Sequence, residues 1–337
     1  GANTTAHFNV AVGKKALLVN TTADSNTAVG YLALTANTTG TKNAAVGRSA
    51  LAACTTGARN TAVGVYALDA ITDANDNAAF GYNALTESTG SNNTAVGSYA
   101  LDVATTADSN TAVGQDALGA CTTGGDNVCV GKGAGSGITT GTESVMIGRD
   151  AGATLTTGAR CTVVGESADV YAQGGYEQVF GWDVHSAGSD RTTIGASSAD
   201  SALVNGATTW TAPSDIRYKE DIQDEKVGLD FINDLRPVTF LWKKENDLPK
   251  DHRAYAEGSE KRTMNGKYNH GFIAQEVKEV IDKYPDIKDG FDMWSADELD
   301  GRQRVGEGAL IPMLVNAVQE LSAEVEELKK QLKYGRI

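Results

Sequence analysis

The chain has 337 residues and a formal net charge of −14, with 29 Lys and Arg residues against 43 Asp and Glu residues. This acidic balance disfavours binding to nucleic acid or to an anionic membrane surface. No apolar run approaches the roughly 20 residues that a membrane-spanning helix needs, so we expect no membrane insertion. The first residues show no signal peptide and already lie inside a repeat, so we expect a C-terminal piece of a longer protein.

A repeat fills the first two-thirds of the chain. Each copy contains an apolar residue followed by glycine, and most copies are 17 residues apart. A fixed period of this length is typical of stacked architectures, in which each unit packs only against its neighbours. The twelve glycines are Gly13, Gly30, Gly47, Gly64, Gly81, Gly97, Gly114, Gly131, Gly148, Gly165, Gly181 and Gly195.

Aligned on the glycine, the repeat is Asn-Thr-Ala-Val-Gly-x-x-Ala-Leu, followed by a turn rich in Thr, Gly and Asp. Short β-favouring runs between turn residues predict short strands with tight corners. We expect each copy to form one coil of a parallel β-solenoid or β-roll that rises about 4.7–4.9 Å per coil. Stacking would place the apolar residue before each glycine in an interior ladder, and the Asn residues in a ladder of side-chain amide hydrogen bonds. The glycine would adopt a positive φ at a corner or allow close backbone approach.

The core of such a coil is thin, because each coil offers mostly Ala, Val and one Leu. Association of three copies around an axis parallel to the stack would thicken this core. The Asn-Thr-Ala-Val-Gly pattern resembles the head repeats of trimeric autotransporter adhesins and similar repeats in phage tail fibres, over residues 1 to about 200. The resemblance implies a homotrimeric shaft over residues 1–205. The period is longer than in typical adhesin heads, and copies after Gly131 lose the Leu and then the Asn, as expected of a transition before another domain.

The shaft surface allows two interpretations. A stack rich in Thr and Asn could bind a host cell-surface glycan or a protein receptor, or it could simply be solvated. An ordered Thr array that binds ice is a weaker alternative, because the Thr residues cluster in turns. The best candidates for stacking against a ligand are the tyrosines near successive turns, Tyr31, Tyr66, Tyr82 and Tyr99.

A different composition begins after a linker at residues 206–213. Three motifs follow: Pro-Ser-Asp-Ile-Arg-Tyr-Lys-Glu-Asp-Ile from Pro213, Leu-Arg-Pro-Val-Thr-Phe from Leu235, and His-Gly-Phe-Ile-Ala-Gln-Glu-Val from His270. In this order they resemble the intramolecular chaperone of endosialidase-type phage tail spikes and tail fibres, a domain shared with the myelin regulatory factor. The resemblance implies that residues 214–337 form an α+β domain that trimerises, drives folding of the shaft and then releases itself by autoproteolysis.

The same resemblance implies a cleavage site between Pro213 and Ser214, with a catalytic dyad of Ser214 and Lys219. A serine hydroxyl needs a base to remove its proton, and a lysine acts as that base only when its charged form is disfavoured. The positive charge of Arg217 would help to disfavour the charged form of Lys219, whereas Asp215 would stabilise that form by pairing with Lys219. The spacing of five fits neither one helix face nor one strand face, so the dyad would need a local turn. The alternative is that Ser214 only caps the entrance to the domain.

Other candidate site residues are few. His270 could orient the dyad or stabilise an oxyanion, although a structural histidine is the alternative. No histidine has a metal-binding pattern, so neither a metal nor another cofactor is expected. The four cysteines fit small buried or turn thiols rather than disulfides or metal ligands: Cys54, Cys121, Cys129 and Cys161.

The chain ends in a predicted helix with Pro312 in its first turn. Apolar residues alternate spacings of three and four, which is the a/d seam of a short coiled coil. This seam would register three copies, although an amphipathic helix that packs on its own domain is the alternative. The seam residues are Ile311, Leu314, Val318, Leu321, Val325, Leu328 and Leu332.

These expectations combine into the C-terminal part of a phage tail fibre or tail spike, assembled in the host cytoplasm and carried on the virion. Its only enzymatic activity would be a single self-cleavage, without turnover of other substrates. One alternative is a trimeric adhesin stalk whose terminal domain does not cleave. Another is a depolymerase, which the sequence disfavours because no insertion with paired carboxylates interrupts the repeats.

Overall fold

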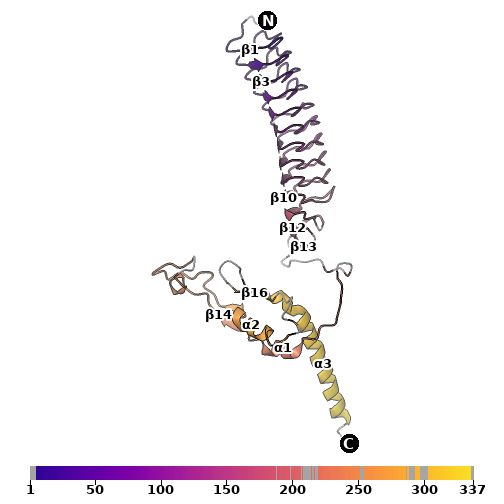
Figure 1. Cartoon of the computed structure of the whole chain (residues 1–337), viewed down its shortest axis with the longest axis vertical. Helices are drawn as coiled ribbons and strands as arrows, with labels where there is room; N and C mark the ends of the chain where they lie inside the picture. The colour runs from indigo at the N-terminus through magenta and orange to yellow at the C-terminus, as the bar shows by residue number, and fades with distance from the viewer. Residues whose placement is uncertain are drawn as a thin grey trace. The chain divides into compact units, whose positions relative to one another are not determined.

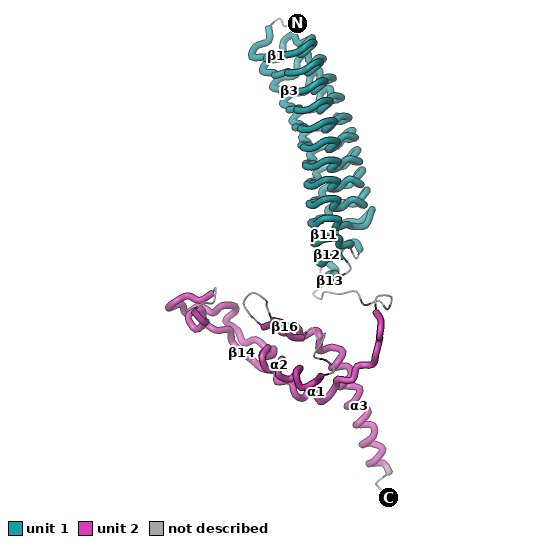
Figure 2. The backbone as a smooth tube through the Cα atoms, in the orientation of Figure 1, with its two compact units in different colours: residues 1–218 teal, residues 219–337 magenta. Residues whose placement is uncertain are grey.

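A computed structural model describes residues 5–334 except 187, 198, 206, 208–213, 215, 217–218, 251–253, 286, 288–292 and 297–302. The chain divides into two compact units, residues 1–218 and residues 219–337 (Figure 2). Each unit is described here by itself. Most of the predicted linker at 206–213, and Pro213, Asp215 and Arg217 of the predicted cleavage site, lie outside the described residues.

The first unit is a β-solenoid of about 11 turns, as the repeat predicts (Figure 1). Each coil contributes one short strand, usually of three residues, to a single 13-stranded sheet. The strands are β1 (Val10–Val12), β2 (Thr27–Val29), β3 (Ala44–Val46), β4 (Thr61–Val63), β5 (Ala78–Phe80), β6 (Thr94–Val96), β7 (Thr111–Val113), β8 (Val128–Val130), β9 (Val145–Ile147), β10 (Thr162–Val164), β11 (Gln178–Trp182), β12 (Arg191–Ala196) and β13 (Ala199–Val204).

The coils stack like on like. Strands β1 to β12 pair in parallel in chain order, and equivalent repeat positions face each other, for example Val46 opposite Val63. The last pair, β12 with β13, is antiparallel. This change of direction ends the stack at its C-terminal side. We call the whole solenoid, residues 5–205, the shaft.

The prediction that the residue before each glycine fills the interior is wrong. The middle residue of each strand from β2 to β10, usually Ala, is fully buried, whereas Val46, Val63 and Phe80 are 40%, 37% and 42% exposed. The reason is the two-residue alternation of a strand. The Asn four residues before the glycine points inward, so the Ala two residues later does too, and the residue next to the glycine points outward. The interior consists instead of two Ala positions and the Leu of each repeat.

The Asn residues form a ladder between coils as predicted, but the ladder is buried and its hydrogen bonds run mostly to the backbone. The backbone N–H of Asn60 donates to Oδ1 of Asn43, one coil earlier, at 2.9 Å. The side-chain amide of Asn60 donates to the carbonyl of Ala74 at 2.9 Å. Each side chain thus joins two coils and satisfies backbone groups that would otherwise be buried without a partner. Direct amide–amide bonds occur at fewer positions, such as Asn127 with Asn110 at 3.1 Å.

The repeated glycine forms a corner, as expected. Gly148 has a φ of +134°, and a Cβ placed there would lie only 2.5 Å from the carbonyl oxygen of Gly165 in the next coil. Both the backbone conformation and the close approach therefore require glycine at this position.

The coils that lose the repeat Leu change a second residue as well. The coil with Ala112 and Leu118 is followed by one with Cys129 and Gly135, and then by one with Met146 and Gly152. A Cβ at Gly135 would lie 2.6 Å from Sγ of Cys129, and a Cβ at Gly152 would contact the Met146 side chain. A larger strand residue thus fills the space that the Leu leaves. The change is a repacking of the same interior.

The second unit is small and mixes helices with two-stranded sheets. Its elements are α1 (Leu229–Asp234), β14 (Val238–Phe240), the 3-10 turn η2 (Glu245–Asp247), β15 (Asn269–Gly271), α2 (Ala274–Ile281), β16 (Trp294–Ala296), β17 (Gln303–Val305), the 3-10 turn η3 (Glu307–Leu310) and the 24-residue helix α3 (Ile311–Tyr334). Strands β14 and β15 pair antiparallel, as do β16 and β17.

One apolar core holds this unit together. Phe231 of α1 and Met293 are fully buried, and Val277 and Ile281 of α2 pack with them. The first turns of α3 close the core, mainly through Met313. The terminal helix is therefore anchored to its own domain at its N-terminal end.

Candidate functional site

The two residues of the predicted dyad lie at the division between the units. Ser214 belongs to the end of the first unit and Lys219 begins the second, and both are exposed in the single chain. Nothing in the described residues tests whether the two side chains act together. The assignment of Ser214 as nucleophile and Lys219 as base therefore stays a prediction.

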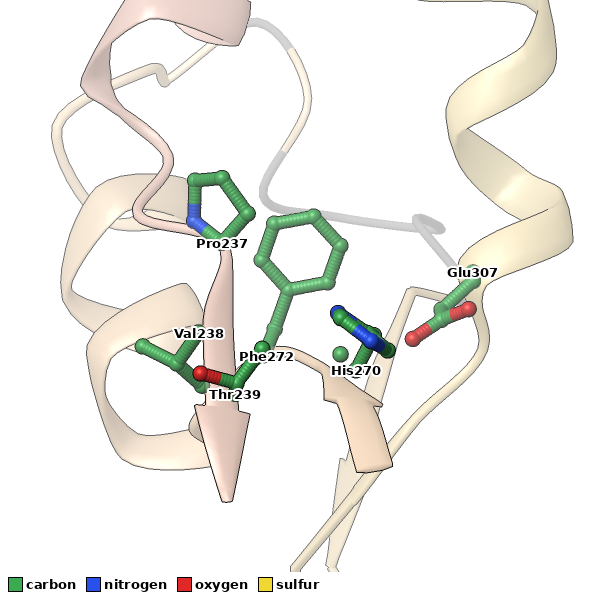
Figure 3. Close-up of a pocket in the computed structure, with 7 residues that line it drawn as sticks. Pro237, Val238, Thr239, His270, Phe272 and Glu307 are labelled. Atoms are coloured by element: carbon green, nitrogen blue, oxygen red, sulfur yellow. The ribbon is translucent and has the colours of Figure 1, made fainter. Parts of the chain in front are cut away.

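His270 lies on β15, in the centre of the short β14–β15 sheet. It pairs with Thr239, while Gly271 pairs with Val238. Its imidazole is exposed and lines an open pocket of about 390 Å³ (Figure 3). The pocket joins two of the sequence motifs that are about 30 residues apart, because strand pairing brings them side by side.

Glu307 forms the opposite side of this pocket and has no motif that marks it in the sequence. It begins the turn η3, and Figure 3 shows its carboxylate across from His270. A Cβ placed on Gly271 would lie 3.1 Å from Oε1 of Glu307, so the glycine leaves room for this carboxylate. Pro237, Val238 and Phe272 supply the apolar part of the lining. Lys219 is not among the residues that line it.

A second, larger pocket of about 830 Å³ shares His270 and Glu307 with the first. Its lining is mainly apolar and includes the edge-to-face pair of Phe240 and Trp242, whose ring centroids are 5.3 Å apart. Together the two hollows place one imidazole and one carboxylate beside a broad apolar surface. In the described part of the chain, no group of three or more His, Cys, Asp or Glu side chains is arranged to hold a metal ion.

The predicted helix seam is present on α3, and it is uncovered in the single chain. All seven seam residues are exposed, from Val325 at 40% to Leu332 at 70%. A different stripe of the helix, with Met313 and Ala317, packs into the domain core. From Leu321 to Lys333 every residue is exposed, so this half of the helix contacts no other described element.

The shaft carries a second uncovered apolar feature. The residues before the corner glycines form an exposed line along the sheet, which we call the apolar column. Its exposed members include Val46, Val63, Phe80, Val96, Val130, Ile147, Phe180 and Ile194. Large continuous apolar surfaces on soluble proteins usually mark interaction sites.

These features define a class of protein: a repetitive β-solenoid shaft followed by a small α+β domain with an uncovered terminal helix. Residues 214–286 match the family model of the peptidase S74 domain, the chaperone of endosialidase. A shaft with this domain after it fits a tail fibre with a C-terminal chaperone. The family is associated with trimerisation, which is consistent with a homotrimer. No curated protein and no solved structure matches the chain.

Among the described helices, none has the length and apolar composition to cross a membrane.

Proposed function

We propose that the chain is the C-terminal part of a phage tail fibre or tail spike, in which three copies form a shaft for host attachment. The C-terminal domain drives assembly and folding of the shaft and is then cut away between Pro213 and Ser214. The single observation that carries this proposal is the apolar column on the outer side of the strands. The match of residues 214–286 to the chaperone of endosialidase supports it.

The apolar column favours self-association over binding of an unrelated partner. It recurs in coil after coil at one repeat position, and Val63 pairs in register with Val46 and Phe80. A closed ring of identical copies places the same column of every copy on one axis. In that arrangement the outward Val and Phe side chains become the shared core that the Ala-rich interior of a single coil lacks.

The seam of α3 supports a parallel arrangement of the copies. With Ile311, Val318 and Val325 at a, residues 324 and 329 fall at g and e, so Glu324 of one helix faces Lys329 of the next in a parallel coiled coil. Antiparallel helices would lose this pair. β-Branched residues at a with Leu at d also suit two-stranded coils, so the seam alone does not select three copies. The proposed number of three is supported instead by the association of the family with trimerisation.

A shaft of this kind has a register problem that a terminal clamp solves. Every coil is nearly the same as the next, so copies shifted by one coil would match almost as well as aligned ones. Joining the copies at their C-terminal helices raises their local concentration and sets the register before the shaft forms. Removal of the clamp afterwards would make unfolding kinetically difficult, because the shaft alone cannot easily find its register again.

The proposed cleavage is a single acyl transfer. Lys219 Nζ accepts the proton of the Ser214 hydroxyl, whose oxygen attacks the carbonyl carbon of Pro213. The C–N bond to Ser214 breaks, the freed amine takes up a proton, and water hydrolyses the ester. A lysine is neutral only where burial disfavours its charge. Since Lys219 is exposed in the single chain, we propose that packing of the other copies covers it, so that cleavage follows assembly.

Gel analysis of the full chain tests the cleavage. We expect a fragment of residues 214–337 in the wild type and its absence in Ser214→Ala and Lys219→Ala, while Lys226→Ala, a lysine seven residues further on, still cleaves. An identical single band in all four proteins contradicts self-cleavage and supports the alternative, a non-cleaving trimeric adhesin stalk.

A further inference from the structure

Three tyrosines form a continuous ladder on successive coils of the shaft, in which Tyr82 and Tyr99 are exposed and Tyr66 is half-buried. Tyr66 and Tyr82 have ring centroids 6.4 Å apart at an interplanar angle of 73°, and Tyr82 and Tyr99 are 5.4 Å apart at 82°. The guanidinium of Arg48 lies 5.2 Å from the Tyr66 ring centroid and ends the ladder on one side. These contacts fix the ring orientations before any ligand binds, which lowers the entropic cost of binding. Tyr31 is 43% exposed and contacts no other aromatic ring among the described residues.

Two polar side chains in the same region hold buried oxygen atoms without a partner. Asn83 follows Tyr82 in the chain and takes the coil position that Tyr66 and Tyr99 occupy in the neighbouring coils. Its Oδ1 atom is buried, as is Oγ1 of Thr86 three residues later, and neither has a hydrogen-bond partner among the described residues. A buried polar atom without a partner costs free energy, which a ligand that supplies the hydrogen bond recovers.

Carboxylates complete this region. Asp69, Thr86 and Asp102 stand five residues after the corner glycines of three successive coils, and Glu87 follows Thr86. Partial burial raises the pKa of Asp69, and the Glu87 carboxylate raises it further. Partial burial also raises the pKa of Asp102, with smaller contributions from Asp116 and Glu87. The region is therefore rich in hydrogen-bond acceptors and already crowded with negative charge.

We propose that the ladder of Tyr66, Tyr82 and Tyr99 is the binding site for a chain of neutral sugars. The partly positive C–H groups of a pyranose ring suit the negative face of an aromatic ring. Sugar hydroxyls donate hydrogen bonds to the Asp69 and Asp102 carboxylates, and to Oδ1 of Asn83 when rotation of its side chain brings this atom to the surface. A run of three rings, one per coil, matches an extended chain that lies along the shaft. An anionic saccharide would meet the carboxylates and be repelled.

A second copy of the chain is not the occupant that this site favours. The ladder lies beyond the glycine corner from the apolar column, and packing two such acidic patches together would place like charges in contact. The inference deepens the proposed attachment role by naming the ligand class, and it depends on that role.

Isothermal titration of the full chain with maltohexaose, cellohexaose, laminarihexaose and mannohexaose tests the proposal. We expect at least one to bind, Tyr82→Ala to weaken its binding at least about tenfold, and Tyr82→Phe to retain most of it. Tyr31→Ala, which removes an exposed tyrosine outside the ladder, leaves binding unchanged. Circular dichroism confirms that each variant folds, and native mass confirms that its oligomeric state is that of the wild type.

Failure to bind any of the four neutral oligosaccharides overturns the inference, as does binding that Tyr82→Ala leaves intact. Preferential binding of a sialylated oligosaccharide, added as a fifth probe, also contradicts it. None of these results bears on assembly or cleavage, which are measured by native mass and by gel, so failure of this inference is distinguishable from failure of the proposed function.

Discussion

The side-chain oxygen of Asn43 accepts a hydrogen bond from the backbone N–H of Asn60, one coil later, at 2.9 Å. Asn60 in turn accepts from the backbone N–H of Asn77 at 3.0 Å. This relay runs through the buried interior and ties each coil to the next one. It explains why an Ala-rich interior with little apolar volume still holds a defined stack.

Replacement of Asn60 by Ala should destabilise the shaft by about 1–3 kcal/mol, because it leaves the N–H of Asn77 and the carbonyl of Ala74 buried without partners. Urea unfolding followed by circular dichroism measures this loss. Thr56→Ala is the control, since Thr56 is an exposed turn residue of the same repeat and is not one of the residues with a positive φ. Equal midpoints for the two variants would show that the buried ladder contributes no specific stability.

Met146 and Gly152 stand where earlier coils have Ala and Leu, and this exchange predicts how substitutions at the two positions combine. Gly152→Leu alone should destabilise the shaft, because the new side chain meets Met146. Met146→Ala alone should cost about 2–5 kcal/mol by leaving a cavity. The double variant restores the Ala and Leu of earlier coils, such as Ala112 with Leu118, and should be more stable than the sum of the single effects predicts.

Urea midpoints of the wild type and the three variants give this coupling free energy. Additive effects would contradict the proposed exchange of volume between the two positions.

The buried thiols predict a loss of stability at alkaline pH. Burial raises the pKa of Cys54 and of Cys121 from the ordinary thiol value to about 11. Above pH 9 these thiols ionise in the unfolded chain but stay protonated in the folded one. Their contribution to stability is therefore complete below about pH 9 and is lost as the pH rises through about 11.

Comparison with a Cys54→Ala, Cys121→Ala variant isolates this effect from other titrating groups, because Ala104 shows that the same repeat position accepts Ala. We expect the urea midpoint of the wild type to fall more steeply between pH 9 and 11 than that of the variant. Parallel curves would contradict the assignment.

Glu320 of α3 should stabilise the C-terminal domain by capping α1. Its carboxylate accepts a hydrogen bond from the backbone N–H of Leu229 at 2.7 Å, at a helix start where Gly228 offers no side chain. Glu320→Ala should lower the domain's stability by about 1 kcal/mol. Glu327→Ala, an exposed glutamate two turns further along at the same heptad position, is the control, and thermal unfolding at 222 nm compares them. Indistinguishable transitions would rule out the capping role.

The sequence predicted the coils, their glycine corners and an Asn ladder between coils, because these depend on local conformation and on the fixed period. It predicted the wrong side for the residue before each glycine, because hydrophobicity favours an inward Val, whereas the strand alternation with the inward Asn turns that residue outward. The compensation of Gly135 by Cys129 is visible in the repeat alignment. The pocket of His270 and Glu307 was not predictable, because it depends on pairing between distant segments and on a glutamate outside every motif.

The native mass of the full chain tests the central claim most directly, namely that copies of this chain assemble through the apolar column. For the Ser214→Ala variant, which keeps the chain uncut, we predict a species of three times 35.1 kDa. The variant Phe80→Asp, Val96→Asp should shift this species towards lower mass, whereas Thr56→Asp, at an exposed turn, should not. A wild-type chain that stays at 35.1 kDa at micromolar concentration would contradict the account.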